Sequence, residues 1–150
     1  MKKISKLDEY LFDLNGYLII NNALNKKELK DLNNILDKLK NIKNDEWIGY
    51  VHGHNYGGKE GLNLQQIYEA GKPFEKLIDH PSWINHMLHF VGGKGTFDHL
   101  HGPLFIDENF ANIRGPGEAI GIHSGNPEGL QRNHYRYQNG KFHCSQVNIL

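Results

Sequence analysis

Three observations predict an α+β fold. Apolar residues recur at helical spacing through the first 90 residues, the pattern then changes to short extended runs after Gly95, and an Asn-Gly pair separates two such runs near the end. Helices followed by strands are typical of α+β or β-sandwich-type architectures. The 150 residues are also the usual size of one domain. We therefore expect a single domain over residues 1–150.

The first elements are a short helix and a strand. Residues 6–14 place Leu7, Tyr10, Leu11 and Leu14 at helical spacing, which predicts a helix with that side buried and with Asn15-Gly16 as its end. The compact apolar run of residues 17–20 follows, and it predicts a buried strand.

A second helix is expected from Asn25 to about residue 42. Asn25 is a good N-cap, and Glu28 stands three residues later, as in a capping box. Charged residues cover one side of this helix and are interpreted as a solvated surface. The other side is apolar and should face the core, through Leu29, Leu32, Ile35, Leu36, Leu39 and Ile42.

Residues 49–92 are predicted to be a loop followed by helices. Residues 49–61 are rich in Gly and His, which favours a loop with exposed His52 and His54, although their spacing would also allow metal binding. Helices are expected over 63–70 and 73–79. A further helix should begin near Pro81, end at Gly92 and bury four residues, Ile84, Met87, Leu88 and Val91.

The last third is predicted to be extended. Strands are expected over 96–101 and 103–106, and residues 114–130 should form a loop that holds a possible short strand at 120–122. Asn-Gly between two extended runs is a strong hairpin signal, so residues 135–137 and 142–150 should pair. The sequence stops inside this apolar run, which we interpret as a truncated product or fragment.

Composition excludes several classes of protein. The 17 basic and 17 acidic residues leave no net charge, which argues against nucleic-acid binding. One cysteine cannot form an internal disulfide. Neither a signal peptide nor an apolar run long enough to span a membrane is present, so we expect a cytoplasmic protein. The oligomeric state cannot be read from the sequence.

Histidine is the residue type in this chain with the most potential for metal binding or catalysis. The common motifs of serine hydrolases and phosphate-binding loops are absent, and Cys144 is interpreted as a buried, inert thiol. Ten histidines offer imidazole ligands for first-row metals, but none is followed two residues later by Asp or Glu, as the commonest non-haem iron pattern requires. A metal site is thus open but weakly indicated, and a zinc protein would need four ligands.

Several phrases, in this order, resemble the phytanoyl-CoA dioxygenase family. The first, at residues 12–20, is an F-x-x-x-G-Y phrase that leads into an apolar strand and a capped helix. The second, at 77–92, is a D-H-P helix. The third and fourth are a His-Ser-Gly phrase at 122–125 and a Y-R-x-x-x-G-x-x-x-C-x-Q-V strand at 135–148. The resemblance spans nearly the whole chain. It implies N-terminal helices packed on a double-stranded β-helix, the cupin-like jelly-roll, which would be partial here.

The resemblance also implies function. Family members bind Fe(II) and 2-oxoglutarate and hydroxylate a small-molecule substrate. His123 matches the proximal iron ligand. Gln146 and Asn148 would lie on the interior face of the last strand and hold 2-oxoglutarate, and Arg136 would meet an anionic co-substrate or substrate. The alternative is a non-catalytic small-molecule-binding or interaction domain on the same scaffold.

The chain departs from the family at the metal site. Gly125 stands where the carboxylate ligand is expected, as in related halogenases; alternatively, a carboxylate such as Glu128 comes from elsewhere, or iron has been lost. The family's P-G-S-H phrase, which carries the distal histidine, is missing. Whether the chain itself is an enzyme therefore stays open, and we expect the isolated monomer to lack turnover.

Overall fold

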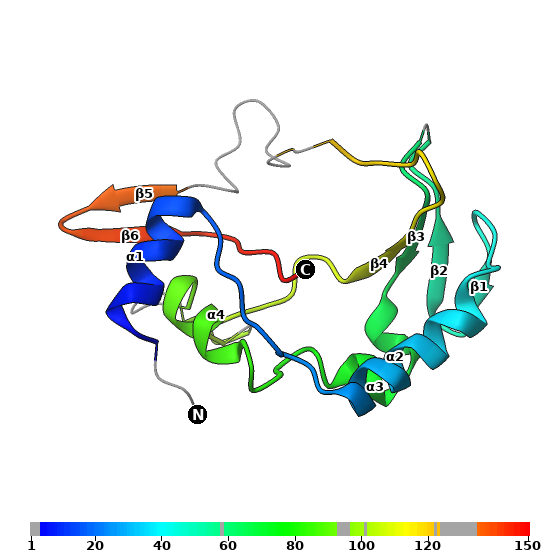
Figure 1. The fold of residues 1–150 in the computed structure, drawn as a ribbon, viewed down its shortest axis with the longest axis horizontal. Helices are drawn as coiled ribbons and strands as arrows, with labels where there is room; N and C mark the ends of the chain where they lie inside the picture. The colour runs from blue at the N-terminus through cyan, green and yellow to red at the C-terminus, as the bar shows by residue number, and fades with distance from the viewer. Residues whose placement is uncertain (1–3, 58, 93–96, 101, 122, 124–134) are drawn as a thin grey trace. The chain divides into compact units, whose positions relative to one another are not determined.

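The computed structural model describes residues 4–57, 59–92, 97–100, 102–121, 123 and 135–150 (Figure 1). The chain divides into two compact units. Unit 1 comprises residues 1–23, 81–105 and 123–150, and unit 2 comprises residues 24–80 and 106–122. Helices combine with antiparallel strands, in agreement with the expected α+β class. None of the described helices is long and apolar enough to cross a membrane.

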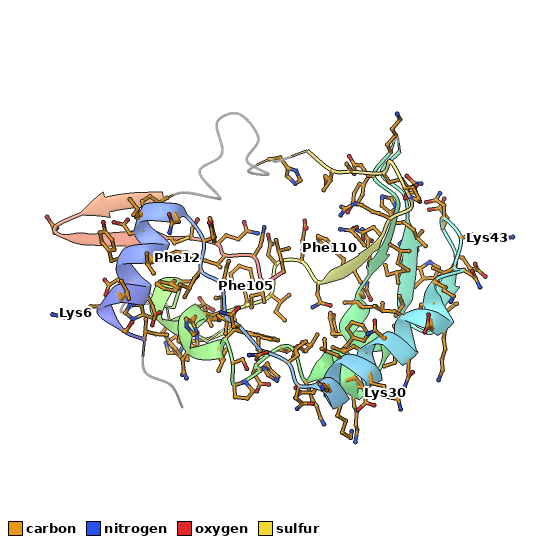
Figure 2. All side chains as sticks on the ribbon, in the orientation of Figure 1. Lys6, Phe12, Lys30, Lys43, Phe105 and Phe110 are labelled. Atoms are coloured by element: carbon orange, nitrogen blue, oxygen red, sulfur yellow. The ribbon has the colours of Figure 1, made fainter. Side chains whose placement is uncertain are left out.

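Unit 2 begins with helix α2 (Lys26–Leu39), whose start was predicted correctly. The Asn25 side chain accepts hydrogen bonds from the backbone N–H groups of Lys27 and Glu28, and the Glu28 carboxylate accepts one from the Asn25 N–H at 2.7 Å. This reciprocal capping box satisfies N–H groups that the first helical turn leaves unpaired. Lys30, on the solvated side, extends away from the ribbon (Figure 2).

The sheet of unit 2 has four antiparallel strands in the order β1-β2-β3-β4 (Figure 1). These are β1 (Trp47–Ile48), β2 (Val51–His54), β3 (Leu62–Gln65) and β4 (Phe110–Ile113). The predicted loop over 49–61 and the predicted helix over 63–70 were therefore partly wrong. Residues 51–54 and 62–65 alternate polar and apolar side chains, a period of two that fits a strand with one buried face.

One face of this sheet packs into the core of unit 2. Leu64 is fully buried and Val51 nearly so, and they cluster with Leu32 and Leu39 of α2 and with Ile42 just beyond its end. The predicted apolar side of α2 is thus largely confirmed, although Leu29 is exposed. After β3 come a 3-10 helix, η1 (Ile67–Ala70), and the short α3 (Lys72–Glu75), which contribute Ile67 and Phe74 to the same core.

Unit 1 begins with helix α1 (Lys6–Asn15), capped by Ser5 and ended by Gly16 in a left-handed conformation. Its predicted buried side was wrong. Leu7, Tyr10 and Leu14 are exposed, and the buried residue is Phe12, which stacks on Phe90 with ring centroids 4.0 Å apart. One large aromatic contact decides the orientation of so short a helix, because a stacked ring buries more area than the scattered leucines.

Helix α4 (Ile84–Phe90) also turns a different side inward from the one predicted. Pro81 and Ser82 lie in a turn before it, and the buried residues are Trp83, His86 and Phe90. The predicted inward residues Ile84, Met87 and Val91 are only partly buried, and Leu88 is exposed. Aromatic side chains and an imidazole, rather than the aliphatic side chains, therefore form the buried side of this helix and its N-cap.

Two predicted strands are not formed in the described residues. The segment 17–20 pairs with no described strand, and Tyr17 and Ile19 are exposed. Of residues 97–106, those that the structure describes form only an isolated bridge between Asp98 and Gly102. Residue 122, in the possible short strand, lies outside the described residues, as do residues 124–130 of the predicted loop 114–130.

The predicted hairpin is confirmed. Strands β5 (Tyr135–Gln138) and β6 (Lys141–Cys144) pair antiparallel around a two-residue turn. Asn139 and Gly140 both have positive φ, 54° and 73°, as a type I′ turn requires. The strand does not continue to Leu150, however, because β6 ends at Cys144.

Candidate functional site

The second face of the unit 2 sheet carries polar and aromatic side chains in two rows across the strands. Residues directly opposite one another in antiparallel strands share a face, so the register defines each row. The first row is Trp47, His52, Gln65 and Phe110, and the second is His54, Asn63 and Asn112. We call these seven residues, together with Tyr56 just beyond β2, the polar face.

Aromatic and imidazole rings form a continuous band along one side of the polar face. The Trp47 indole stacks on the His52 imidazole with centroids 4.5 Å apart and planes 19° apart. The His54 ring lies 5.8 Å from that of His52 and meets the Tyr56 ring edge-on at 4.4 Å. Such contacts hold the rings at defined angles, which gives a preformed surface rather than a set of independent side chains.

Gln65 ties this band to the middle of the sheet. Its side-chain N–H donates to the Tyr56 hydroxyl at 3.0 Å, and its carbonyl oxygen lies 3.5 Å from Nδ1 of His52. On the other side of the imidazole, Nε2 of His52 is 3.8 Å from a carboxylate oxygen of Asp45. His52 is therefore flanked by two acceptors, an arrangement that orients its ring.

A pair of amides completes the polar face on β3 and β4. Nδ2 of Asn63 donates to Oδ1 of Asn112 at 3.1 Å. Asn63 is only 5% exposed, and its own Oδ1 is buried and accepts no hydrogen bond within the described part of the chain. An unpaired buried amide oxygen costs about 1–3 kcal/mol, so this position loses stability that an apolar residue would keep.

The polar face contains no ready metal site. Histidine and aspartate are present, but nowhere in the described residues does a group of three or more His, Cys, Asp or Glu side chains lie close enough together to hold a metal ion. The expectation of exposed loop histidines was also wrong. His52 and His54 are half-buried members of β2, and their environment is aromatic and amide-like.

The residues predicted from the family resemblance belong to unit 1. His123 is exposed and lies outside the named helices and strands. Arg136 is on β5, and its side chain lies outside what the structure describes. Gln146 is half-buried and Asn148 exposed, both beyond the end of β6, so the prediction that they share one face of a strand was wrong. Gly125 and Glu128 fall outside the described residues.

Cys144, predicted to be buried, is half-buried at the end of β6. Its thiol donates to the Gln146 carbonyl oxygen at 2.9 Å, and burial raises the pKa of the thiol above its ordinary value. Because the thiolate is the nucleophilic form, a raised pKa disfavours reaction at neutral pH.

Unit 1 also holds a cavity of about 450 Å³. It is lined by residues 18–23, together with Asp8, Pro81, Ser82 and His86. The Ser82 hydroxyl, which would be the obvious nucleophile, donates to the Ala23 carbonyl oxygen at 2.6 Å. Ser82 therefore joins two segments of unit 1, and this cavity is a weaker candidate than the polar face.

Comparisons with known proteins give no assignment, since no family model, no curated protein and no solved structure matches the chain.

Proposed function

We propose that the chain is a domain of the phytanoyl-CoA dioxygenase type, whose activity is hydroxylation dependent on Fe(II) and 2-oxoglutarate. The observation that carries this proposal is the order of the family-like phrases along nearly the whole chain. The capped helix α2 follows the first phrase and the β5–β6 hairpin lies in the last, although the strand expected over 17–20 is not formed.

The unit 2 sheet supports the finer fold proposal, a cupin-like jelly-roll. A jelly-roll is built from antiparallel strands whose two faces differ, one packed on covering elements and one turned to an interior. The β1–β4 sheet has this property, with Val51 and Leu64 in the core and the polar face opposite. We propose that the polar face lines the interior side of such a wall.

The proposed metal centre uses residues of unit 1. His123 is the proposed ligand of Fe(II), with Gln146, Asn148 and Arg136 proposed to contact 2-oxoglutarate. The described residues alone do not make up an iron site, because no group of three metal-ligating side chains is found among them. Iron with 2-oxoglutarate bound would activate O₂, the oxidant of the reaction, and the protein would supply ligands and positioning.

Calorimetry under anaerobic conditions tests this function. With Fe(II) present, 2-oxoglutarate should bind to the wild-type chain, and His123→Ala should abolish the heat, because removing the imidazole removes an iron ligand. His99→Ala, at another exposed histidine, is the matched control and should bind as wild type does. Heat that does not depend on Fe(II), or that survives in His123→Ala, would contradict the proposal.

The second candidate function is a non-catalytic small-molecule-binding domain on the same scaffold. The polar face favours it, because its preformed rings and amides include no group of metal ligands among the described residues. In the same calorimetric series such a domain would be indifferent to both Fe(II) and 2-oxoglutarate.

A further inference from the structure

We infer that the polar face is a binding site for a neutral saccharide. The inference goes beyond the proposed function, because it uses only residues of unit 2 and none of the residues proposed to bind iron or 2-oxoglutarate. It rests on three properties of the polar face, which are its accessible aromatic rings, the absence of lysine and arginine from its rows, and its uncharged amides.

Aromatic rings stand accessible at both ends of the first row. Trp47 is 54% exposed on β1, and Phe110, labelled in Figure 2, is 43% exposed on β4. Tyr56 is also exposed, beside His54. Keeping large rings in water forgoes the burial that usually stabilises them. A ligand with a flat apolar side, such as the C–H face of a sugar ring, would cover them.

The groups between these rings are uncharged hydrogen-bonding groups. Gln65, Asn63 and Asn112 contribute amides, and no lysine or arginine belongs to either row. The carboxylate of Asp45 lies beside His52, 3.8 Å from Nε2 of the imidazole. A phosphate or carboxylate ligand would therefore find no cation to pair with, whereas a neutral hydroxyl would find both donors and acceptors.

The amide pair leaves hydrogen-bond donors at the surface. Asn112 is exposed and uses its Oδ1 to accept from Asn63, so its own N–H groups can donate to a ligand. A sugar hydroxyl can accept such a hydrogen bond, which a purely apolar ring cannot do.

The dimensions fit more than one sugar ring. Strands in a sheet lie about 4.8 Å apart, so a row across four strands is roughly 14 Å long. Trp47 and Phe110 stand at its two ends, with His52 and Gln65 between them. A disaccharide laid along this row would contact an aromatic ring at each end and amides in the middle.

The test is to titrate the 150-residue chain with cellobiose, maltose or chitobiose, in the absence of Fe(II) and 2-oxoglutarate. Binding is measured by calorimetry and by tryptophan fluorescence. Trp83 is buried, so a fluorescence change should come from exposed Trp47. We expect at least one disaccharide to bind, and Trp47→Ala to weaken binding about tenfold or more. Tyr50→Ala removes an exposed ring in the turn between β1 and β2 and should leave the affinity within about twofold.

Phe110→Ala is the second variant and should also weaken binding, so that a folding defect in one variant does not decide the test. His123→Ala should bind sugar as wild type does, which separates this inference from the proposed function. At roughly 10 mM, a ligand with a Kd of 1 mM is about nine-tenths bound. Three results would overturn the saccharide assignment. They are no binding at that concentration, wild-type affinity for the disaccharide in both Trp47→Ala and Phe110→Ala, or binding of adenosine to the wild-type chain that is tighter than binding of any of the three disaccharides.

Discussion

Gly53 lies on the core side of β2, between two histidines of the polar face. Replacing it with alanine should disturb the packing of the core and shift those histidines. They are His52 and His54, and Gly53 itself lies opposite Leu64. A Cβ at this position would lie far inside contact distance of the Lys43 carbonyl oxygen, and 3.2 and 3.3 Å from two side-chain carbons of Ile42. A backbone oxygen cannot rotate away as a side chain can, so the strand or the 42–46 segment must move.

The size of the effect follows from two opposing contributions. Overpacking a filled site costs about 1–3 kcal/mol, and shifting the strand also weakens the backbone hydrogen bonds that Gly53 exchanges with Asp45 and Glu46. Against this, Gly→Ala at an unstrained position stabilises by about 0.4–1 kcal/mol, through the unfolded chain. We expect Gly53→Ala to lower the free energy of unfolding by about 1–3 kcal/mol.

Urea unfolding followed by circular dichroism measures this change. With an m-value of about 2 kcal/mol/M, a loss of 2 kcal/mol lowers the midpoint by about 1 M at unchanged m. Gly115→Ala is the matched control, because a Cβ there would lie at an ordinary 3.6 Å from its nearest neighbour. If Gly53→Ala unfolds at the wild-type midpoint, the close approach of β2 to residues 42–43 is not a real constraint on this fold.

Two further predictions concern the core and helix α2. Leu64→Ala should cost about 2–5 kcal/mol in urea unfolding because Leu64 is fully buried, whereas Ile19→Ala, at a residue 71% exposed, should stay within about 0.5 kcal/mol. The hydrogen bond from the Asn25 backbone N–H, together with one from His80, holds the pKa of the Glu28 carboxyl below its ordinary value. At acidic pH the unfolded chain therefore binds more protons than the folded chain. The contribution of Glu28 to the free energy of unfolding is lost as pH falls through that lowered pKa. Thermal unfolding should therefore show the advantage of wild type over Glu28→Gln shrinking from about pH 5 to pH 3, and a constant difference would contradict the assignment.

The sequence predicted the elements with local signals and missed those decided by distant contacts. The α2 cap and the Asn139-Gly140 turn are chemistry within a few residues, so both were located correctly. The inward sides of α1 and α4 depend on the stacking of Phe12 on Phe90, residues far apart in sequence, and were predicted wrongly. Apolar spacing in a helix of two or three turns does not outweigh one such contact.

The polar face was missed although a signal for it existed. Val-His-Gly-His over 51–54, Leu-Asn-Leu-Gln over 62–65 and Ala-Asn-Ile over 111–113 alternate with a period of two. The glycines around the first run favoured a loop, and the leucines of the second suggested a helix. Which strands are neighbours could not be predicted, because β3 and β4 are separated by more than forty residues and their pairing is a long-range contact.

Strands β2 and β3 of unit 2 have one face in the core and the other in the polar face. On β2 and β3 the core side holds Val51 and Leu64, while the other side holds His52 and Gln65. Side chains on the second side can therefore change without loss of the core. Asn63 breaks this division, because it is buried and yet keeps an unsatisfied amide oxygen. Its amide serves the sheet by donating to Asn112, and the proposed saccharide would contact the accessible rings and amides around it instead.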